Sequence, residues 1–420
     1  MNWLPTEDTD APASCGCRGA DPSHVRGGFE AEPTDYTVTE DWGTGGAEDA
    51  FDLSDFYSGG RNRARRKVTF DDGEDRGSAL AAASGKGHHA DAQAAIARLS
   101  TDMGECSEAV GRRPGEPCSS ARVAAAVKEF VDAAPETPAP DVAADAPPTL
   151  PSAATGEAAA IRAAAQVLGC TSESCVVSHP KFRRFVADAG AGLADVGGVN
   201  VLDVEIARRF KTDGPRDSTQ LLSNFNIDGV LQEWAAAHGD FYNFSFNMMD
   251  FEQTGGSLAR TDTADILEGR SIQNLGKMGG SVRRPCATFA CVLNTDVSTG
   301  RGKHWVAVFG DCRGEGEWSV EYFNSAGNPP PPPVTRWLEE TASRLMTYRA
   351  SHPRKYGDGA VVPVPLTDIR HQDSQTECGN YALYYIRRRL EGAPYSEFRE
   401  TRIPDVAMLA FRKHIFRSGK

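Results

Sequence analysis

The sequence predicts an α+β domain, on the evidence of two patterns along the chain. Helix-like segments come first, a group of short strand-like segments follows, and helical segments return near the end, which is the segregated order of α+β folds. The N-terminal part differs in composition, being rich in Ala, Gly, Pro, Asp, Glu and Ser. We therefore expect one folded domain at residues 158–420, behind an extension at residues 1–157.

The extension is predicted to be disordered. Its segment PETPAPDVAADAPPTLP can neither bury enough apolar surface nor hold a helix. The patches ADAQAAIARLS and SSARVAAAVKEFVDAA have helical character, which we expect to be transient. A basic cluster is a candidate nuclear-import or nucleic-acid patch, with a solvated charge run in a flexible tail as the alternative. Its members are Arg61, Arg63, Arg65, Arg66 and Lys67.

Three helices are expected at the start of the folded domain. They are GEAAAIRAAAQVLG (156–169), which Gly169 closes, HPKFRRFVADAG (179–190) and LLSNFNIDGVLQEWAAAHG (221–239). The third has apolar residues at helical spacing. Its core candidates are Leu221, Leu222, Phe225, Val230, Leu231 and Trp234.

Strands follow these helices. Short β-branched and aromatic runs bounded by turn residues occur at 284–296 and 302–311, and EWSVEYFNSAG (317–327) alternates like a half-buried strand. A helix at 334–350 and a strand at 360–366 come next. The run Pro329 to Pro333 is expected to be a stiff connector, with docking into an aromatic groove as the alternative.

Charge and hydropathy exclude several classes of protein. The formal net charge of -13 argues against a general nucleic-acid-binding protein. The start, MNWLPTEDTDAPASCGC, lacks the basic and apolar segments of a secretory signal, and no apolar run approaches the ~18 residues of a spanning helix. We expect a soluble protein that is neither secreted nor membrane-spanning.

The 10 cysteines are scattered, and in such a chain without a signal peptide they are expected to be reduced thiols. Cys170, Cys175 and His179 lie close together, and zinc binding is one interpretation. However, their spacing does not match the short zinc pairs, and no second pair is evident. We expect instead that Ser172 or Ser174 caps a turn and that the cysteines pack, with no metal bound.

The segment HQDSQTECGNYALYYIRRRL (371–390) places Cys378 at the threshold of an apolar helix. A free thiol is mostly protonated at neutral pH, but a helix N-terminus and a nearby imidazolium can lower its pKa by several units. Cys378 is thus a candidate nucleophile, with core packing as the alternative. Gly379 has no side chain and would let a substrate backbone pass close to the sulfur.

His304 and Asn324 are candidates for the partners of this thiol. His304 lies in the predicted strand GKHWVAVF, where a lone histidine is more often a packing residue. Asn324 ends the next strand and could accept a hydrogen bond from the imidazole, which would fix its tautomer. Ordinary turn chemistry is the alternative for Asn324. Trp305 would shield the site or bind substrate backbone, with plain core packing as its alternative.

The loop before Cys378 offers a side-chain amide. An acyl-transfer intermediate carries an oxyanion, and a side-chain amide together with the backbone N–H of Cys378 can donate to it, at roughly 3 kcal/mol per donor. Both Gln372 and Gln375 lie in this polar loop and compete for the role.

The ordered set GKHW, YFNSAG and Q-x5-CG resembles the Ulp1/adenain-type cysteine peptidases, a group with a papain-like fold. Within this clan, the segments GCTSESCVV, LLSNFNIDGVLQEW and CVLNTDVSTGRGKHW are similar to the virion-maturation proteases of large DNA viruses. The resemblance covers residues 165–415. It implies a central mixed sheet flanked by helices and a reaction that needs no cofactor.

Carried over residue by residue, the resemblance implies that His304 is the general base and Cys378 the nucleophile. It makes Asn324 the residue that orients the imidazole, and it favours Gln372 over Gln375 as the oxyanion donor. Trp305 and Gly379 would contact substrate. Asn324 departs from the Asp that cellular SUMO proteases usually have, which favours the viral-maturation function.

The resulting expectation is a cysteine endopeptidase that matures viral capsid proteins or structural polyproteins in the virion or in the host cytoplasm or nucleus. Such peptidases tend to cut at Gly-Gly-type sites, and the extension holds three diglycines, in RGGF, TGGA and SGGR. Trimming of the extension is therefore one expectation, and glycines that merely keep the tail flexible are the alternative. A SUMO- or ubiquitin-like isopeptidase and an inactive virion scaffold or binding module are the rival functions.

Overall fold

The structure is a computed structural model of the 420-residue chain. It describes residues 104–111, 113, 115–134, 150–189, 193, 195–196, 199–215, 220–276 and 280–417. Residues 1–103, with the basic cluster and the three diglycines, lie outside the described residues. None of the helices within the described ranges has the length and apolar character that a membrane crossing requires.

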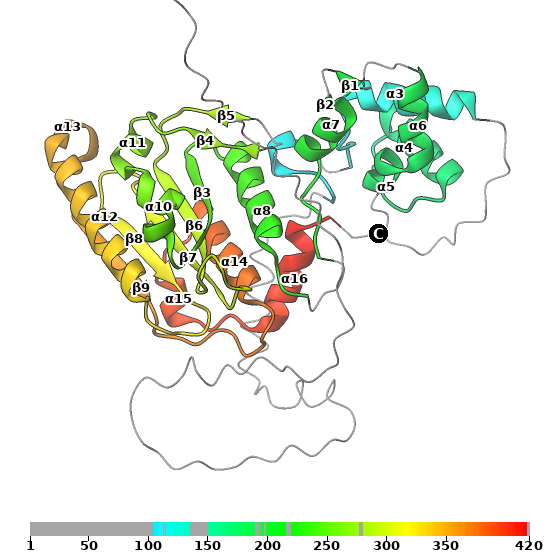
Figure 1. Cartoon of the computed structure of the whole chain (residues 1–420). Coiled ribbons are helices and arrows are strands. Elements are labelled where there is room, and N and C mark those ends of the chain that lie inside the picture. The colour runs from blue at the N-terminus through cyan, green and yellow to red at the C-terminus, as the bar shows by residue number, and fades with distance from the viewer. Residues whose placement is uncertain are drawn as a thin grey trace, which may run out of the picture. The chain divides into compact units, whose positions relative to one another are not determined.

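A five-stranded mixed sheet organises the C-terminal part (Figure 1). Its spatial order is β3 (Phe241–Met248), β6 (Thr288–Asn294), β7 (Trp305–Asp311), β8 (Trp318–Phe323) and β9 (Val361–Leu366). The central pairs β6–β7 and β7–β8 are antiparallel, whereas β3 and β9 run parallel to their neighbours at the two edges. The predicted central mixed sheet is confirmed.

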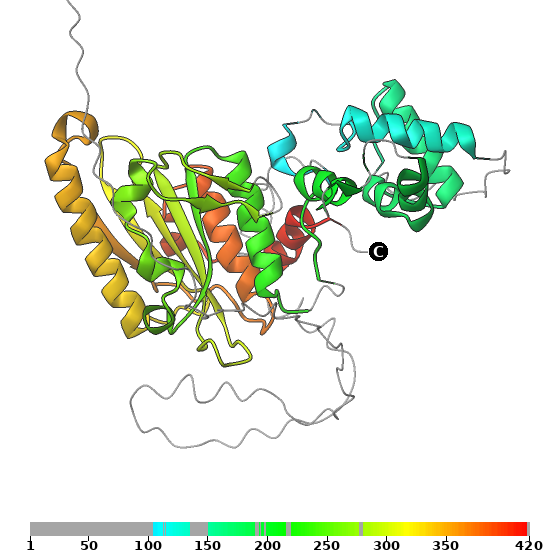
Figure 2. The same ribbon diagram turned by 45° about the horizontal axis from the view of Figure 1, so that its top comes forward.

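Helices cover both faces of this sheet, as Figures 1 and 2 show from two directions. On one face, α14 (Cys378–Leu390) packs on β7, together with α8 (Asn224–Ala237) and α16 (Asp405–Ile415). On the other face, α12 (Pro332–Ser351) packs on β8 and β9. Alternate residues of the central strands therefore enter two separate cores.

Short elements complete the sheet-containing part. These are α9 (Phe251–Thr254), α10 (Ser257–Arg260), α11 (Thr263–Leu267), β4 (Gln273–Asn274), β5 (Ser281–Val282), α13 (Pro353–Tyr356) and α15 (Glu397–Glu400).

A helical part precedes the sheet along the chain and has its own core. Its elements are η2 (Glu108–Val110), α3 (Ala121–Ala133), α4 (Gly156–Leu168), α5 (Glu173–Ser178), α6 (Pro180–Ala189), β1 (Asp195–Val196), β2 (Val199–Asn200) and α7 (Val201–Arg209). Helix α4 ends at Gly169, whose φ of 68° is the left-handed conformation that a C-terminal cap requires. The predicted closure of this helix is confirmed.

The prediction of disorder up to residue 157 is wrong for the described residues 104–111, 113, 115–134 and 150–157, the last of which include the start of α4. Ser120 caps α3, and Val123, Ala126 and Val127 of that helix are buried in the core of the helical part. Alanine is only weakly apolar, so an alanine-rich helix is easily mistaken for disordered sequence when only composition is considered. The small side chains nevertheless allow α3 to pack closely on α4. The start of the peptidase domain at residue 158 stays a prediction.

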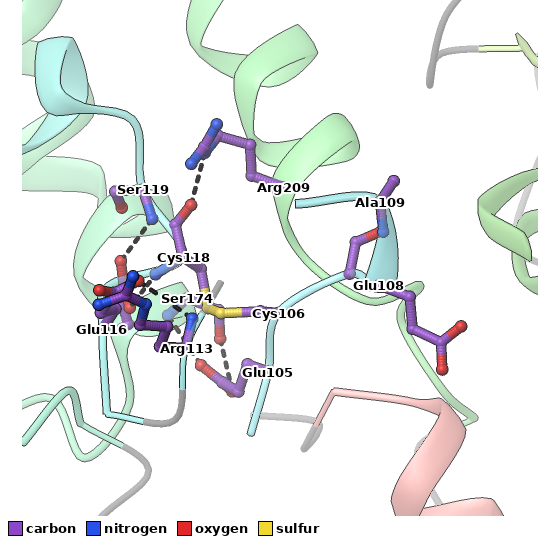
Figure 3. The surroundings of a disulfide bond; sticks show 12 residues. Glu105, Cys106, Glu108, Ala109, Arg113, Glu116, Cys118, Ser119, Ser174 and Arg209 are labelled. Atoms are coloured by element: carbon purple, nitrogen blue, oxygen red, sulfur yellow. Dashed lines mark hydrogen bonds between the residues drawn. A yellow bond between two sulfur atoms is a disulfide. The ribbon is translucent and has the colours of Figure 1, made fainter. Parts of the chain in front are cut away.

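A disulfide between Cys106 and Cys118 ties down the first described segment (Figure 3). The buried carboxylate of Glu105 accepts hydrogen bonds from the backbone N–H and the hydroxyl of Ser174, at 2.9 and 2.8 Å. Glu173 likewise accepts the N–H groups of Cys118 and Ser119, at 2.9 and 2.8 Å. Covalent and polar contacts thus compensate for a segment that is poor in large apolar side chains.

A second disulfide joins Cys170 to Cys175, so the prediction that the cysteines are all reduced is wrong for four of them. The predicted cap at the start of α5 is confirmed, because the hydroxyl of Ser172 accepts the N–H of Cys175. Among the residues that the structure describes, no group of three or more His, Cys, Asp and Glu side chains is arranged to hold a metal ion.

Two other predictions need correction. Strand β8 was expected to be half buried, but all six of its residues are buried because helices cover both faces of the sheet. In the segment before and within α8, Leu222 is buried, whereas Leu221 is 49% and Phe225 80% exposed. The other core candidates of this segment, Val230, Leu231 and Trp234, are buried as predicted.

Candidate active site

Cys378 is the first residue of α14, as the sequence predicts, and it is buried between this helix and β7. The backbone N–H groups of Trp305 and Gly379 hydrogen-bond to the thiol and lower its pKa, but burial is the larger effect, and the net pKa is raised. Burial therefore opposes the thiolate form in the free protein, and the role of Cys378 as nucleophile stays a prediction.

His304 and Asn324 come together at one edge of the sheet. His304 immediately precedes β7 and Asn324 immediately follows β8, and these strands are antiparallel neighbours. The start of one strand therefore lies beside the end of the other. Nε2 of His304 is 2.8 Å from Oδ1 of Asn324. The backbone N–H of Trp305 hydrogen-bonds to the thiol of Cys378. Trp305 follows His304 directly in the chain, so the start of β7 contacts the sulfur.

The amide of Asn324 makes a complete set of four hydrogen bonds. Its oxygen accepts the backbone N–H of Ala326 at 2.9 Å and faces His304. Its nitrogen donates to the hydroxyl of Tyr322 at 3.1 Å and to the carbonyl of Asn328 at 3.4 Å. An asparagine amide has two donors and two acceptor sites, so every one is used.

This arrangement sets the tautomer of His304. Since the oxygen of Asn324 is the atom that faces the imidazole, Nε2 must carry the hydrogen and donate it. Nδ1 of the neutral ring is then unprotonated and available as a base. Burial lowers the pKa of His304, and the hydrogen bond with Asn324 partly offsets this by raising it. The site at rest thus holds a neutral thiol and a neutral imidazole.

Gln372 is buried in the loop before α14, and both ends of its amide are held. The hydroxyl of Ser325 donates to Oε1 at 2.7 Å, and Nε2 donates to the carbonyl of Ser374 at 2.7 Å. An amide nitrogen carries two hydrogens, so one of them is left for another acceptor. Gln375, its competitor for the oxyanion role, is exposed.

Trp305 and Gly379 have packing roles in this structure. The indole N–H of Trp305 donates to the carbonyl of Leu222 at 3.0 Å, and its ring meets Phe246 edge to face. A Cβ added to Gly379 would lie 3.1 Å from the side chain of Leu222, so a glycine lets α14 approach this leucine. The predicted contacts of Trp305 and Gly379 with substrate stay predictions.

Ser325 was missed by the sequence analysis. It follows Asn324 in YFNSAG, and its hydroxyl reaches Gln372 across 47 residues of sequence. The signal available was a small polar side chain in the turn that also holds the asparagine. Only the folded chain shows which amide it contacts.

No protein-family model matches the chain. A cysteine protease of African swine fever virus, from a Malawi tick isolate, is 47% identical over 252 residues, which are 60% of this chain and 85% of the relative. A SUMO-1 cysteine protease of the same virus, from a Kenyan pig isolate, is 46% identical over the same shares of both chains.

The crystal structure of the African swine fever virus pS273R protease matches with a TM-score of 0.60 and 37% sequence identity, over 77% of this chain and 99% of that one. The fold and its relatives define a cysteine protease, as the sequence predicted. More particularly, the chain belongs to the family of African swine fever virus pS273R cysteine proteases.

Proposed function

We propose that Cys378 is the nucleophile and His304 the general base of this cysteine protease, with Asn324 orienting the imidazole. The oxyanion would be held by the amide of Gln372 and the backbone N–H of Cys378. The observation that supports this assignment best is the complete set of hydrogen bonds on Asn324, because it leaves Nδ1 of His304 free to take a proton.

In the first step Nδ1 of His304 takes the thiol proton of Cys378 as the sulfur attacks the scissile carbonyl carbon. The carbonyl oxygen becomes negative and accepts hydrogen bonds from the amide of Gln372 and from the backbone N–H of Cys378. Collapse breaks the C–N bond, and the leaving amine takes the proton from His304. Water then attacks the thioester with His304 again as the base, which releases the acid and restores the thiol.

For the substrate, we propose viral structural proteins cut at Gly-Gly-type sites, in the virion or in the infected cell. The viral origin of the relatives supports this, as does Asn324 in place of the aspartate expected of cellular SUMO proteases. The second candidate is removal of SUMO-like proteins, which the printed name of one relative, a SUMO-1 cysteine protease, favours. Both functions fit the peptidase domain predicted at 158–420.

The test compares the wild-type chain with Cys378→Ala and His304→Ala on diglycine peptides and on SUMO fusions. We expect both variants to lose activity and the wild type to prefer the diglycine peptides. Folded but fully active variants would refute the assignment of the catalytic residues. Faster cleavage of the SUMO fusions would favour the second candidate, and an inactive wild-type chain would favour a virion scaffold or binding module.

The chain also offers its own diglycine substrates in residues 1–103, outside the described residues. We expect purified wild-type protein to lose up to about 60 residues slowly, while Cys378→Ala stays intact, because an extension that is disordered, as predicted from its composition, would enter the active site without an unfolding cost. N-terminal sequencing should find new starts at Phe29, Ala47 or Arg61. The diglycine at Gly255–Gly256 links two helices in the folded part and should survive. Identical trimming of both proteins would show contaminating proteases.

A further inference from the structure

Asn324 poses a problem of orientation that an aspartate would not. The two ends of a carboxylate are equivalent, but an amide has an acceptor end and a donor end of nearly the same size. If the amide of Asn324 turned over, its NH2 group would face Nε2 of His304. That nitrogen would then have to accept, and the hydrogen of the neutral ring would move to Nδ1, where the base is needed. The proposed mechanism therefore depends on what holds the amide.

Tyr322 is the side chain that holds it. The phenol lies two residues before Asn324, on the same face of β8 because side chains alternate along a strand, and it is fully buried. Its oxygen accepts a hydrogen bond from Nδ2 of Asn324 at 3.1 Å. Burial raises the pKa of Tyr322 far above its usual range, so the phenol keeps its hydrogen.

The phenol hydrogen has an acceptor of its own. It points to the carbonyl of Pro329, 3.5 Å away, in the proline run that leads into α12. The carbonyls of Pro330 and Pro331 accept the hydroxyl of Thr335 instead. With its hydrogen directed to Pro329, the phenol oxygen presents only lone pairs to Asn324. It can therefore receive the NH2 end of the amide and not the oxygen end.

We propose that Tyr322 is a positioning residue for catalysis, which selects the Nε2–H tautomer of His304 by fixing the amide of Asn324. This inference rests on the catalytic roles proposed above for His304 and Asn324. The backbone N–H of Ala326 holds the same amide from the oxygen side at 2.9 Å. Tyr322 is the member of this set that a substitution can remove.

The test is Tyr322→Phe in the full chain, with the tautomer read by two-bond 1H–15N correlation spectra of 15N-histidine-labelled protein at neutral pH. His304→Ala identifies the His304 signals by their loss. We expect the wild type to show one tautomer with Nε2 protonated. Tyr322→Phe should show a mixture, with a roughly tenfold lower kcat and a KM changed less than about twofold.

A matched control is Tyr242→Phe. Tyr242 is a buried tyrosine of the same hydrophobic core, and its hydroxyl donates to the carbonyl of Ile272 at 3.1 Å, away from Asn324. This variant should lose a comparable amount of thermal stability but keep the single tautomer and the wild-type kcat. An unchanged tautomer in Tyr322→Phe would overturn the inference, even if activity fell, because the hydroxyl would then act through stability alone.

Asn324→Asp supplies a second, independent readout. A carboxylate has no donor end to misplace, so the kcat loss caused by Tyr322→Phe should shrink in the Asn324→Asp background. Equal losses in both backgrounds would contradict the inference. Failure of the proposed function itself would look different, since His304→Ala would then retain activity whatever the tautomer spectra show.

Discussion

The hydroxyl of Ser325 donates a 2.7 Å hydrogen bond to Oε1 of Gln372, and the backbone N–H of Gln372 returns a 3.0 Å hydrogen bond to the carbonyl of Ser325. The turn after β8 therefore holds Asn324 and Gln372 at once. This pairing directs Nε2 of Gln372 away from the turn, as an oxyanion donor requires. A shift of the turn would disturb both Asn324, the proposed partner of His304, and Gln372, the proposed oxyanion donor.

Gln372→Ala should lower kcat by roughly 10²–10³-fold with little change in thermal stability, because the developing oxyanion loses a preorganised donor. Steady-state kinetics on a diglycine peptide and a melting curve measure the two effects. Gln375→Ala is the matched control, since that side chain is exposed in the same loop and its loss should change kcat less than about twofold. The reverse pattern would assign the oxyanion role to Gln375.

Asn324→Ala should move the acid limb of the kcat/KM profile to lower pH. If His304 is the base as proposed, its protonation stops catalysis, so activity should fall as pH drops through the pKa of the imidazole. Burial already places this pKa below its ordinary value of about 6.5. The hydrogen bond with Asn324 raises the pKa, so its loss lowers it further. A limb that stays in place or moves to higher pH would contradict this assignment.

His371 should make the protein less stable in acid. It is buried, its Nε2 lies 3.1 Å from the carbonyl of Phe398, and its Nδ1 accepts the N–H of Ile403 at 3.1 Å. Burial lowers its pKa to about 4. Because the unfolded chain takes up this proton near pH 6.5, the free energy of unfolding should fall by up to about 1.4 kcal/mol per pH unit from there toward pH 4.

Urea unfolding at pH 7 and pH 5 measures this dependence. His371→Gln should be less stable than the wild type at pH 7 but should lose less stability on going to pH 5. The same loss in both proteins would show that other groups, such as His304, account for the acid sensitivity.

Glu321→Gln should destabilise the fold by about 3–5 kcal/mol. Glu321 is fully buried in β8 and meets Arg389 of α14 through two hydrogen bonds, of 2.7 and 2.8 Å. Among the described residues, removing its charge leaves the buried guanidinium with Asp311 as its remaining charged partner, at 3.0 Å. Glu340→Gln is the control, because its pair with Arg344 on α12 is exposed and should contribute less than about 1 kcal/mol. Chemical denaturation that gives equal losses would contradict this ranking.

The sequence could predict the pieces of the site that depend on local pattern. Cys378 precedes an apolar helical run, and His304 and Asn324 flank strands whose composition is clear, so their places at the ends of α14, β7 and β8 follow from the chain. Contacts between residues far apart in the sequence cannot be predicted from local pattern. The hydrogen bond of Ser325 to Gln372 and the phenol of Tyr322 on Asn324 depend on how separate elements are brought together.

Strand β3 was not predicted from the sequence at all, for a different reason. Its pairing with β6 shifts register between Asn243 and Phe246, and Ser245 has a φ of 61°. This bulge breaks the two-residue alternation by which a strand is found in a sequence. The prediction that Leu221 and Phe225 are core residues was wrong for a related reason. Helical spacing of apolar residues indicates a buried stripe, but it does not show at which residue the stripe ends.

The two disulfides require oxidising conditions, whereas a nucleophilic thiol in the same chain requires reducing ones. Both crosslinks lie in the helical part, whereas the proposed nucleophile, Cys378, is a free thiol in the sheet-containing part. A buffer with enough dithiothreitol to protect a reactive cysteine also cleaves accessible disulfides by thiol exchange. Cys106 and Cys118 are buried, so exchange at that crosslink requires the helical part to open first, whereas Cys175 is partly exposed. Purification and storage conditions therefore decide which covalent form of this enzyme enters an assay.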